Sequence, residues 1–328
     1  MHSGRRIVGY YNMYSQDIQP LLTIGITCYS EGDWLLDCWD SVLNQTDSRW
    51  EAVLIMDGTN HQRTRDIFEH LQHPKLRKFT MLQNMGPYPT RNKAFEMTET
   101  PYHFYLDGDD QLMPESVSLV LETVNRYPSA DIVYGDYQTF GGTSDVWEIP
   151  RNFGPELFIE GQRVPGACVY SKKLWKQLGG FAGDLARGNA DYDFFIGALE
   201  AGAIARHCEH IFYRCRTGNV GKVSSSYGCR YHETHEFMVR RHPAFFKKAK
   251  WRRRFLGYGY RRAVLENIAA GNEKAAMSLA WRACVQGLWR DYQLRSLALR
   301  GKFPEIVYIP ARAIWRIIKK VTRMINPT

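Results

Sequence analysis

Three carboxylates stand within four residues, directly after a short apolar run. Residues 102–106 (Tyr-His-Phe-Tyr-Leu) have the composition of a strand, and Asp107, Asp109 and Asp110 follow it around Gly108. Glycine permits a turn there that a side chain would hinder. Three acids this close repel one another, so we expect a hard cation that prefers oxygen ligands, Mg²⁺ or Mn²⁺, to compensate them. The alternative interpretation is an acidic surface turn that caps the following helix.

The elements around this cluster alternate between strand and helix. Hydrophobic periodicity predicts strands over 21–27, 50–56, 77–82, 102–106 and 130–134, and helices over 31–45, 61–71, 89–97 and 114–126. Such alternation is typical of an α/β fold with a parallel sheet and right-handed crossovers.

Polar residues follow three of these strands where they end. Thr27 and Tyr29 come after the first strand, Asp57 after the second, and the acidic cluster after the fourth. The carboxyl ends of parallel strands meet along one edge of a sheet, and open α/β sheets bind their ligands at that edge. The sequence therefore predicts one binding site built from three separate segments.

Length and composition favour one large domain with an appendage. The chain has 328 residues, 44% of them hydrophobic, which is enough to bury a core. Its seven cysteines include no Cys-x-x-Cys spacing, which argues against a disulfide framework or a zinc site and favours a reducing compartment. The first residues are not followed by an apolar run of signal length, and no apolar stretch reaches the roughly 18–20 residues of a membrane span. We expect a cytoplasmic protein.

Basic residues are concentrated in the C-terminal quarter. Residues 245–328 hold 19 Lys and Arg against 4 Asp and Glu, a balance of +15, whereas residues 1–244 hold 24 and 30, a balance of −6. Helices are predicted over 263–283, 289–299 and 311–325, and the last has an isoleucine stripe opposite basic residues, as in an interfacial helix.

This charge pattern predicts that 245–328 contacts an anionic membrane surface, with the protein held peripherally on the inner face. The alternative is a helix packed on the rest of the protein with a solvated basic face. No recognisable nucleic-acid module accompanies the basic tail, so binding of nucleic acid is not expected.

Seven short motifs occur in a fixed order along the chain. They are Thr27-Cys28-Tyr29, Ser41 to Thr46, Asp57-Gly58-Thr59, Asn84-Met85-Gly86 with Arg91-Asn92, Asp107-Gly108-Asp109, Gly179-Gly180-Phe181 and Ala190-Asp191-Tyr192-Asp193. Together they resemble the motifs of the inverting family 2 glycosyltransferases, over about residues 20–220. Enzymes of this family move a sugar from a nucleotide-diphosphate donor to an acceptor.

The resemblance implies a GT-A fold, which is a Rossmann-like mixed α/β sheet flanked by helices, here with a helical C-terminal appendage. It implies a catalytic domain over 21–244, between an N-terminal arm over 1–20 and the basic helical region over 245–328. It further implies a role in polysaccharide biosynthesis, with a UDP-sugar as donor and a glycan or lipid-linked saccharide as acceptor.

The resemblance also implies roles for single residues in donor binding. Thr27 and Tyr29 would flank the base and ribose, and Asp57 would accept a hydrogen bond from one of them. The alternatives are a strand-end turn and a helix N-cap. Arg91 would lie near the diphosphate or stabilise the fold beneath it, the alternative being an exposed helical arginine.

Asp109 would ligate Mn²⁺ or Mg²⁺ directly, and Asp107 would bind the ribose or a metal-bound water. The ion would neutralise charge on the departing nucleotide. Asp191 matches the general base, which removes a proton from the acceptor hydroxyl as that oxygen attacks the anomeric carbon. Its alternative role is an N-cap for a helix over 193–201.

Two departures from the family pattern leave a catalytically inactive, nucleotide-binding subunit as an alternative function. Ala190 replaces the usual glutamate before the base, and Arg216 stands where many relatives have a histidine that binds the metal. Arginine cannot ligate a metal, but its planar fork suits diphosphate oxygens. The alternative is a surface arginine on a mobile loop. The Gly- and Ser-rich residues 218–228 are interpreted as a lid over the donor or as a plain linker.

Overall fold

The computed structural model describes residues 19–185, 188–218 and 228–302. Almost all of the predicted N-terminal arm, most of the predicted lid and the predicted helix over 311–325 lie outside these residues. The described residues group into two compact units, and the predicted domain boundaries stay predictions. The first unit holds 19–153, 165–185 and 203–218, and the second holds 154–164, 188–202 and 228–302.

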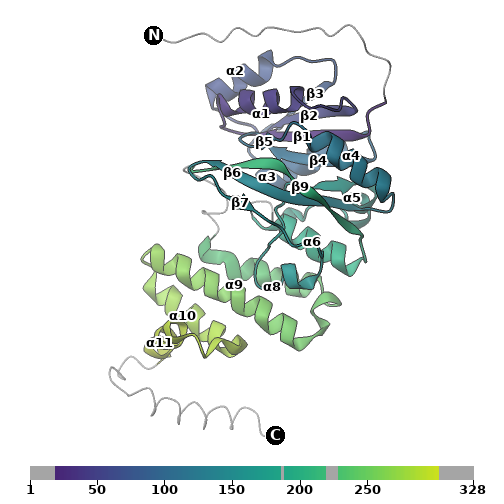
Figure 1. The fold of residues 1–328 in the computed structure, drawn as a ribbon. Helices are drawn as coiled ribbons and strands as arrows, with labels where there is room; N and C mark the ends of the chain where they lie inside the picture. Colours follow the sequence, from purple (N-terminus) through teal and green to yellow (C-terminus); the bar gives the residue numbers. More distant parts are fainter. Residues whose placement is uncertain (1–18, 186–187, 219–227, 303–328) are drawn as a thin grey trace. The chain divides into compact units, whose positions relative to one another are not determined.

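A mixed sheet forms the first unit (Figure 1). Its strands are β1 (Leu22–Cys28), β2 (Trp50–Met56), β3 (Leu76–Thr80), β4 (Tyr102–Asp107), β5 (Gln111–Leu112), β6 (Ile132–Gly141), β7 (Val146–Trp147), β8 (Val169–Ser171) and β9 (Ala205–Thr217). The order is β3-β2-β1-β4-β8-β6-β9-β5, with β7 paired to β6. The expected parallel pairing holds for β1 to β4. Beyond them β8 runs antiparallel to β4 and β6, so the sheet is mixed, as the family resemblance implies.

Helices flank this sheet because one stripe of each is apolar. They are α1 (Trp34–Leu43), α2 (Gln62–His70), α3 (Pro87–Glu96), α4 (Ser116–Arg126) and α5 (Lys172–Leu178). In α1 the side chains of Leu35, Cys38, Trp39 and Val42 are buried, at the spacing of a single helix face. Contacts place α3 on β1 and β2, and α4 on β9.

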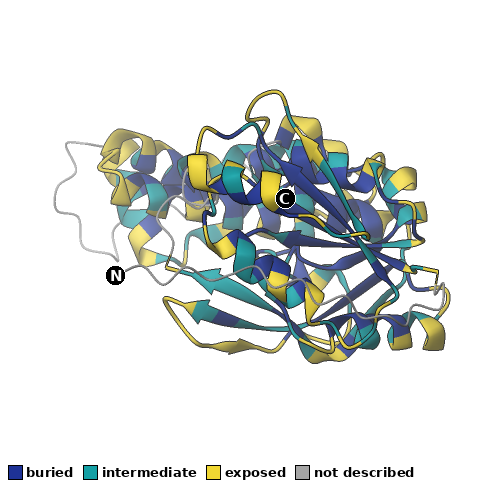
Figure 2. Cartoon of the chain, turned by 90° about the horizontal axis from the view of Figure 1, so that it is seen from above, coloured by how far each residue is buried: buried dark blue, intermediate teal, exposed yellow. Residues whose placement is uncertain are grey.

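The core of the first unit lies in its central strands. Every residue of β1 is buried, and six of the seven residues of β2 are. Strands covered on both faces tend to have continuous apolar runs, which β2 shows from Ala52 to Met56, whereas in β1 threonine and glycine alternate with apolar residues. In Figure 2 the central strands are accordingly dark blue, while strands at the margin of the sheet are partly teal or yellow.

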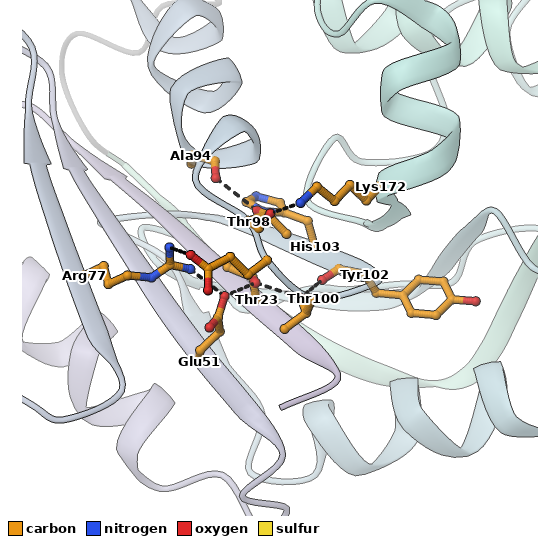
Figure 3. Close-up of polar contacts among 10 residues, drawn as sticks. Thr23, Glu51, Arg77, Ala94, Thr98, Thr100, Tyr102, His103 and Lys172 are labelled. Carbon is orange, nitrogen blue, oxygen red and sulfur yellow. Dashed lines mark hydrogen bonds and ion pairs between the residues drawn. The ribbon is translucent and has the colours of Figure 1, made fainter. Parts of the chain in front are cut away.

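Side-chain hydrogen bonds join the amino-terminal ends of β1, β2 and β4 (Figure 3). Thr23 donates to Glu51 over 2.7 Å and shares a hydrogen bond of the same length with Thr100. Glu51 also accepts from Arg77 at 2.7 Å. This end of the sheet is therefore closed by contacts within the protein, and the acidic cluster lies at the opposite, carboxyl end.

The second unit is helical. Its helices are α6 (Ala190–Glu200), α8 (Tyr231–Arg241), α9 (Ala249–Ala269), α10 (Glu273–Ala283) and α11 (Tyr292–Lys302). Small and apolar side chains of α9, α10 and α11 form one core, which includes Ala263, Ala280 and Ala298. The helix expected over 263–283 is wrong as a single element, because the chain turns at 270–272 between α9 and α10. None of the described helices is both long and apolar enough to cross a bilayer.

Candidate functional site

The ends of β1, β2 and β4 are tied to one another. Thr27 pairs with Asp107 in the parallel register, and its hydroxyl donates to the Asp107 carboxylate over 3.4 Å. The backbone N–H of Gly108 donates to the Thr27 carbonyl at 2.9 Å, and that of Asp57 donates to the Cys28 carbonyl at 2.8 Å. A Cβ at Gly108 would lie only 3.0 Å from the Thr27 oxygen, so a side chain would press on β1. The structure brings these three strand ends together, as expected.

Arg91 lies against Asp107 inside the first unit. One guanidinium nitrogen donates to both Asp107 oxygens, at 2.7 and 2.8 Å. The guanidinium carbon also lies 4.9 Å from the ring centroid of Tyr88 and 4.2 Å from that of Tyr105. Arg91 is buried, so it is not the exposed helical arginine of the alternative interpretation. Its ion pair stabilises the fold beneath the acidic turn.

Asp57 has structural partners for both of its oxygens. The backbone N–H groups of Met85 and Gly86 donate to them at 2.8 and 2.9 Å. Gly86 is the N-cap residue of α3, so Asp57 holds the entrance to that helix, whereas the next helix, α2, has His61 as its N-cap residue. Each carboxylate oxygen offers more than one lone pair, so Asp57 is able to accept a further hydrogen bond.

Arg216 connects the end of β9 to the acidic turn. Its backbone N–H donates to an Asp110 oxygen at 2.7 Å, and its Nε donates to the Asp109 carbonyl at 3.0 Å. The buried Asp110 thus joins the turn to β9, and it does not cap α4. Arg216 lies within β9 and not on the loop that the alternative interpretation places it on.

Aromatic rings enclose the Arg216 guanidinium. Its carbon lies 4.9 Å from the ring centroid of Trp34 and 4.4 Å from that of Phe140, and one nitrogen lies 3.5 Å from Asp37. The Arg216 side chain is only 12% exposed. A guanidinium held this way is a fixed positive charge beside the acidic turn.

Glu31 joins the acidic cluster, and the sequence analysis missed it. The backbone N–H of Tyr29, an exposed residue, donates to Glu31 at 2.6 Å. Burial, with the charges of Asp109 and Asp107 adding to it, raises the pKa of Glu31 to about 7. The only signal was its position two residues after Tyr29. Burial is the main cause of this shift, and the two nearby carboxylates add less to it.

Asp191 belongs to the second unit, where it is the second residue of α6. The N-cap residue of that helix is Asn189, so the N-cap interpretation of Asp191 is wrong. The helix begins three residues earlier than expected, which places Asp191 in the first turn, where the helix dipole favours a negative charge. The side-chain amide of Gln162 donates to Asp191 Oδ2 at 2.7 Å.

Asp193, two residues further on, is a structural residue. It is buried and accepts from His242 Nε2 at 2.9 Å, while Arg241 Nε lies 3.2 Å from its other oxygen. The second ring nitrogen of His242 lies 3.0 Å from Glu200. Burial alone would lower the pKa of His242, but hydrogen bonds and charge from Asp193 and Glu200 raise it. Asp193 therefore anchors α6 to α8.

Among the described residues, no group of three or more His, Cys, Asp or Glu side chains is arranged to hold a metal ion.

Comparisons with known proteins agree with this architecture. The sequence model of glycosyl transferase family 2 matches residues 23–183. The chain is 26% identical to the chondroitin synthase of Escherichia coli over 201 residues, which are 59% of this chain and 28% of that protein. It is 29% identical to the teichoic acid poly(glycerol phosphate) polymerase of Staphylococcus epidermidis over 107 residues, which are 32% of this chain and 15% of that protein. The chain thus spans less than a third of the length of these two relatives.

Solved structures share the fold at low sequence identity. S. aureus TarS 1–349 in complex with UDP-GlcNAc superposes with a TM-score of 0.64 at 12% identity, over 84% of this chain and 83% of that one. The mannosyltransferase PcManGT of Pyrobaculum calidifontis, solved with GDP-Man and Mn²⁺, superposes with a TM-score of 0.51 at 15% identity, over 88% of this chain and 89% of that one. The matched residues 23–183 contain β2 to β4, nearly all of β1 and the acidic turn at their carboxyl edge; this region of the chain belongs to glycosyl transferase family 2, and the protein has the GT-A fold.

Proposed function

We propose that this protein is an inverting glycosyltransferase that moves a sugar from a nucleotide-diphosphate donor, a UDP-sugar, to a saccharide or lipid-linked acceptor. The observation that carries the proposal is the joining of Thr27, Asp57 and the acidic turn at one edge of the sheet. Family membership and the fold shared with TarS, which was solved with UDP-GlcNAc, support it. The relatives named as synthases and polymerases of chondroitin and teichoic acid support a role in polysaccharide biosynthesis.

The donor is proposed to lie across the edge formed by β1, β2 and β4. Tyr29, whose ring is exposed, stacks on the base, and Asp57 accepts a hydrogen bond from the base or ribose with a remaining lone pair. Arg216 supplies fixed positive charge toward the diphosphate. Arg91 acts through Asp107, whose two oxygens it orients.

The acidic turn fits a divalent cation that arrives with the diphosphate. The residues present are oxygen donors, and the negative charges of Asp109 and Asp107 add to the raised pKa of Glu31, which is caused chiefly by burial. Such sites bind Mg²⁺ through one or two carboxylates and substrate phosphates rather than a closed protein cage, so the lack of a three-ligand group in the described residues is compatible with it. Asp109 would hold the ion, with Asp107 beside it. When bound, Mn²⁺ or Mg²⁺ supplies electrostatic stabilisation of the leaving nucleotide.

Asp191 is proposed as the general base. Direct displacement with inversion requires a base that takes the acceptor proton as the new bond to the anomeric carbon forms. The first turn of a helix favours the ionised carboxylate, which is the form that accepts a proton. Asp193 does not compete for this role, because His242 and Arg241 already neutralise it inside the second unit.

A second candidate function is a catalytically inactive nucleotide-binding subunit. The bidentate contact of Arg91 with Asp107 favours it, because that contact engages both oxygens of one proposed nucleotide and metal ligand. Turnover of a donor separates the two candidates, because only an active enzyme releases free nucleotide.

We also propose that the second unit binds an anionic membrane surface. The α9 basic patch consists of exposed side chains at the start of that helix, Lys247, Lys248, Lys250, Arg252 and Arg253. None of the five has a carboxylate partner among the described residues, whereas Arg254 pairs with Glu160 at 2.8 Å. The helix dipole adds positive potential at this end, and the first turn contains no acid. Near an anionic leaflet each cation contributes about 1 kcal/mol, enough for peripheral attachment.

The experiment that tests the proposed function is a thermal-shift screen of UDP-GlcNAc, UDP-glucose, UDP-galactose and GDP-mannose, with and without Mn²⁺. A donor at about 100 times its Kd stabilises the folded state by about 2.7 kcal/mol and raises Tm. Nucleotide release from the donor that binds is then measured for the wild type, Asp191→Asn and Asp40→Asn. Asp40 is an exposed aspartate of α1, so its variant is a matched control.

We expect Asp191→Asn to bind the donor but to lose nucleotide release, while Asp40→Asn retains both. Binding without release by the wild type would support the inactive subunit. No binding of any donor would contradict both candidates.

A further inference from the structure

We infer that Gln162 is a positioning residue for Asp191. The inference rests on the proposed function, in which Asp191 is the base, and adds to it a partner that comes from outside the family motifs. Gln162 lies in the segment 154–164, and both residues belong to the second unit.

The Gln162 amide makes two hydrogen bonds that fix its plane. Its Nε2 lies 2.9 Å from the Val164 carbonyl and 2.7 Å from Asp191 Oδ2. A side-chain amide nitrogen carries two hydrogens, so each acceptor receives one of them. The carbonyl two residues along the chain thus orients the amide, and the amide in turn orients the carboxylate.

The segment that carries Gln162 is fixed by its own contacts. The backbone N–H of Arg163 donates to the Leu157 carbonyl at 3.0 Å, which closes a compact turn. The Tyr192 hydroxyl, buried within α6, donates to the Phe158 carbonyl. Tyr192, the residue after Asp191, thus contacts the same turn that carries Gln162.

Gly161 completes this support. Its φ of +108° disfavours any other residue, and a Cβ there would lie 2.8 Å from the Tyr258 hydroxyl of α9. The turn is therefore packed against two helices of the same unit, α6 and α9.

A neutral donor is the chemistry that a general base needs from its partner. A cation beside Asp191 would hold the carboxylate strongly in the ionised form and so weaken it as a proton acceptor. An amide also orients the carboxylate, but it reduces the basicity of the carboxylate less. Tyr231 also faces Asp191. The pKa of the Tyr231 phenol is raised, chiefly by burial, with the charges of Tyr258 and Asp191 adding and Arg262 opposing, so this neighbour too is neutral near pH 7. The Gln162 amide thus orients the Asp191 carboxylate as a neutral donor.

The test uses the full chain and the sugar nucleotide that it hydrolyses out of UDP-GlcNAc, UDP-glucose, UDP-galactose and GDP-mannose. Nucleotide release is measured from pH 5 to 9 for the wild type, Gln162→Leu, Gln162→Glu and Gln177→Glu. Leucine keeps most of the volume and removes the donor, and glutamate is isosteric but adds a charge. Gln177 is an exposed residue of α5, so Gln177→Glu carries the same charge change elsewhere.

We expect Gln162→Leu to lower kcat by about 10- to 100-fold, as for the loss of a hydrogen bond to a charged group, with KM for the donor changed less than about twofold. In Gln162→Glu two carboxylates share one site, so the acidic limb of the kcat/KM profile moves to higher pH by about one unit or more. Gln177→Glu should leave both unchanged. The shift in Gln162→Glu reports contact between residue 162 and the base, whereas loss of kcat at a nearly unchanged KM in a folded Gln162→Leu variant reports the positioning role.

The outcomes separate this inference from the function on which it rests. No turnover by the wild type, or full turnover by Asp191→Asn, contradicts the proposed function and the inference with it. Loss of turnover in Asp191→Asn together with unchanged kcat in Gln162→Leu overturns the inference alone. If Gln162→Leu does not fold, as judged by circular dichroism, Gln162→Glu decides, and an unshifted acidic limb counts against the role of Gln162.

Discussion

Arg91 offers the sharpest test of how the acidic turn is held. Its side chain is 8% exposed, and that of its partner Asp107 is 36% exposed. Methionine in place of Arg91 keeps most of the apolar contact with the neighbouring rings and removes the charge. The carboxylate left behind then faces the negative charges of Asp109 and Glu31 without its cation.

The expected cost follows from the burial of the two partners. Removing one member of a fully buried ion pair costs about 3–5 kcal/mol, because the other charge is left uncompensated. Since about a third of the Asp107 side chain is exposed, water solvates the remaining charge in part, and we expect about 2–3 kcal/mol of lost unfolding free energy for Arg91→Met. Asp107→Asn should cost less, because the amide oxygen still accepts a hydrogen bond from Arg91, whose guanidinium also keeps its contacts with two aromatic rings.

The assay is urea unfolding followed by tryptophan fluorescence, for the wild type, Arg91→Met, Asp107→Asn and the double variant. A coupling free energy of about 1–2 kcal/mol is expected from this cycle, because the two residues are in direct contact. A coupling below about 0.5 kcal/mol would refute the reasoning. If Arg91→Met leaves the urea midpoint unchanged but weakens UDP binding, Arg91 contacts the donor and does not support the fold.

Three further predictions concern pH and surface charge. The pKa of Glu31 is raised to about 7 in the folded protein, so between about pH 4.5 and 7 the folded state holds a proton that the unfolded chain has released. The free energy of unfolding therefore falls as pH rises through this range. Glu31→Gln should flatten the dependence of the urea midpoint on pH. The pKa of His242 is raised by Asp193 and Glu200, so the stability that protonated His242 contributes to the folded state is complete below pH 6.5 and is lost as pH rises above that value. His242→Gln should therefore lower Tm more at pH 6 than at pH 9. Reversing the charge of three residues of the α9 basic patch should abolish sedimentation with vesicles that contain phosphatidylglycerol, and added salt should weaken the wild-type binding.

Each of these predictions has a control. For Glu31, a wild-type midpoint that does not change between pH 5 and pH 8 would contradict the raised pKa of this residue. For His242, an equal loss at both pH values would show a packing role without the charge. For the basic patch, Lys173→Glu with Lys176→Glu alters exposed lysines of α5 and should leave sedimentation intact. Equal binding to vesicles of phosphatidylcholine alone would exclude an electrostatic contact.

The parts of the fold that the sequence predicted are those set by local patterns. β1, β2 and β4 lie within one residue of their expected bounds, because continuous apolar runs bounded by polar residues have few alternatives. That Thr27 and Asp107 lie at one edge of the sheet followed from the parallel strands, whereas their direct pairing is seen only in the structure. β8 was not predicted, because three residues inserted antiparallel between longer strands carry no periodic signal.

The parts of the site that were missed depend on contacts between distant residues. Gln162 reaches Asp191 across 29 residues and His242 reaches Asp193 across 49, so no local pattern shows either pair. The raised pKa of Glu31 depends on its burial, which a single acid in the sequence does not reveal. Arg216 was singled out because it departs from a family motif, but its place between two rings comes only from the fold.

The division of the chain into units has a consequence for engineering. The helical unit is assembled from three stretches of sequence, two of which interrupt the sheet unit. Tyr192, in the second stretch, packs 5.5 Å from Phe255, in the third. A graft that swapped only the residues after 244 between relatives would therefore strip α6 of its packing partner. Chimeras that exchange the helical unit have to carry all three stretches together.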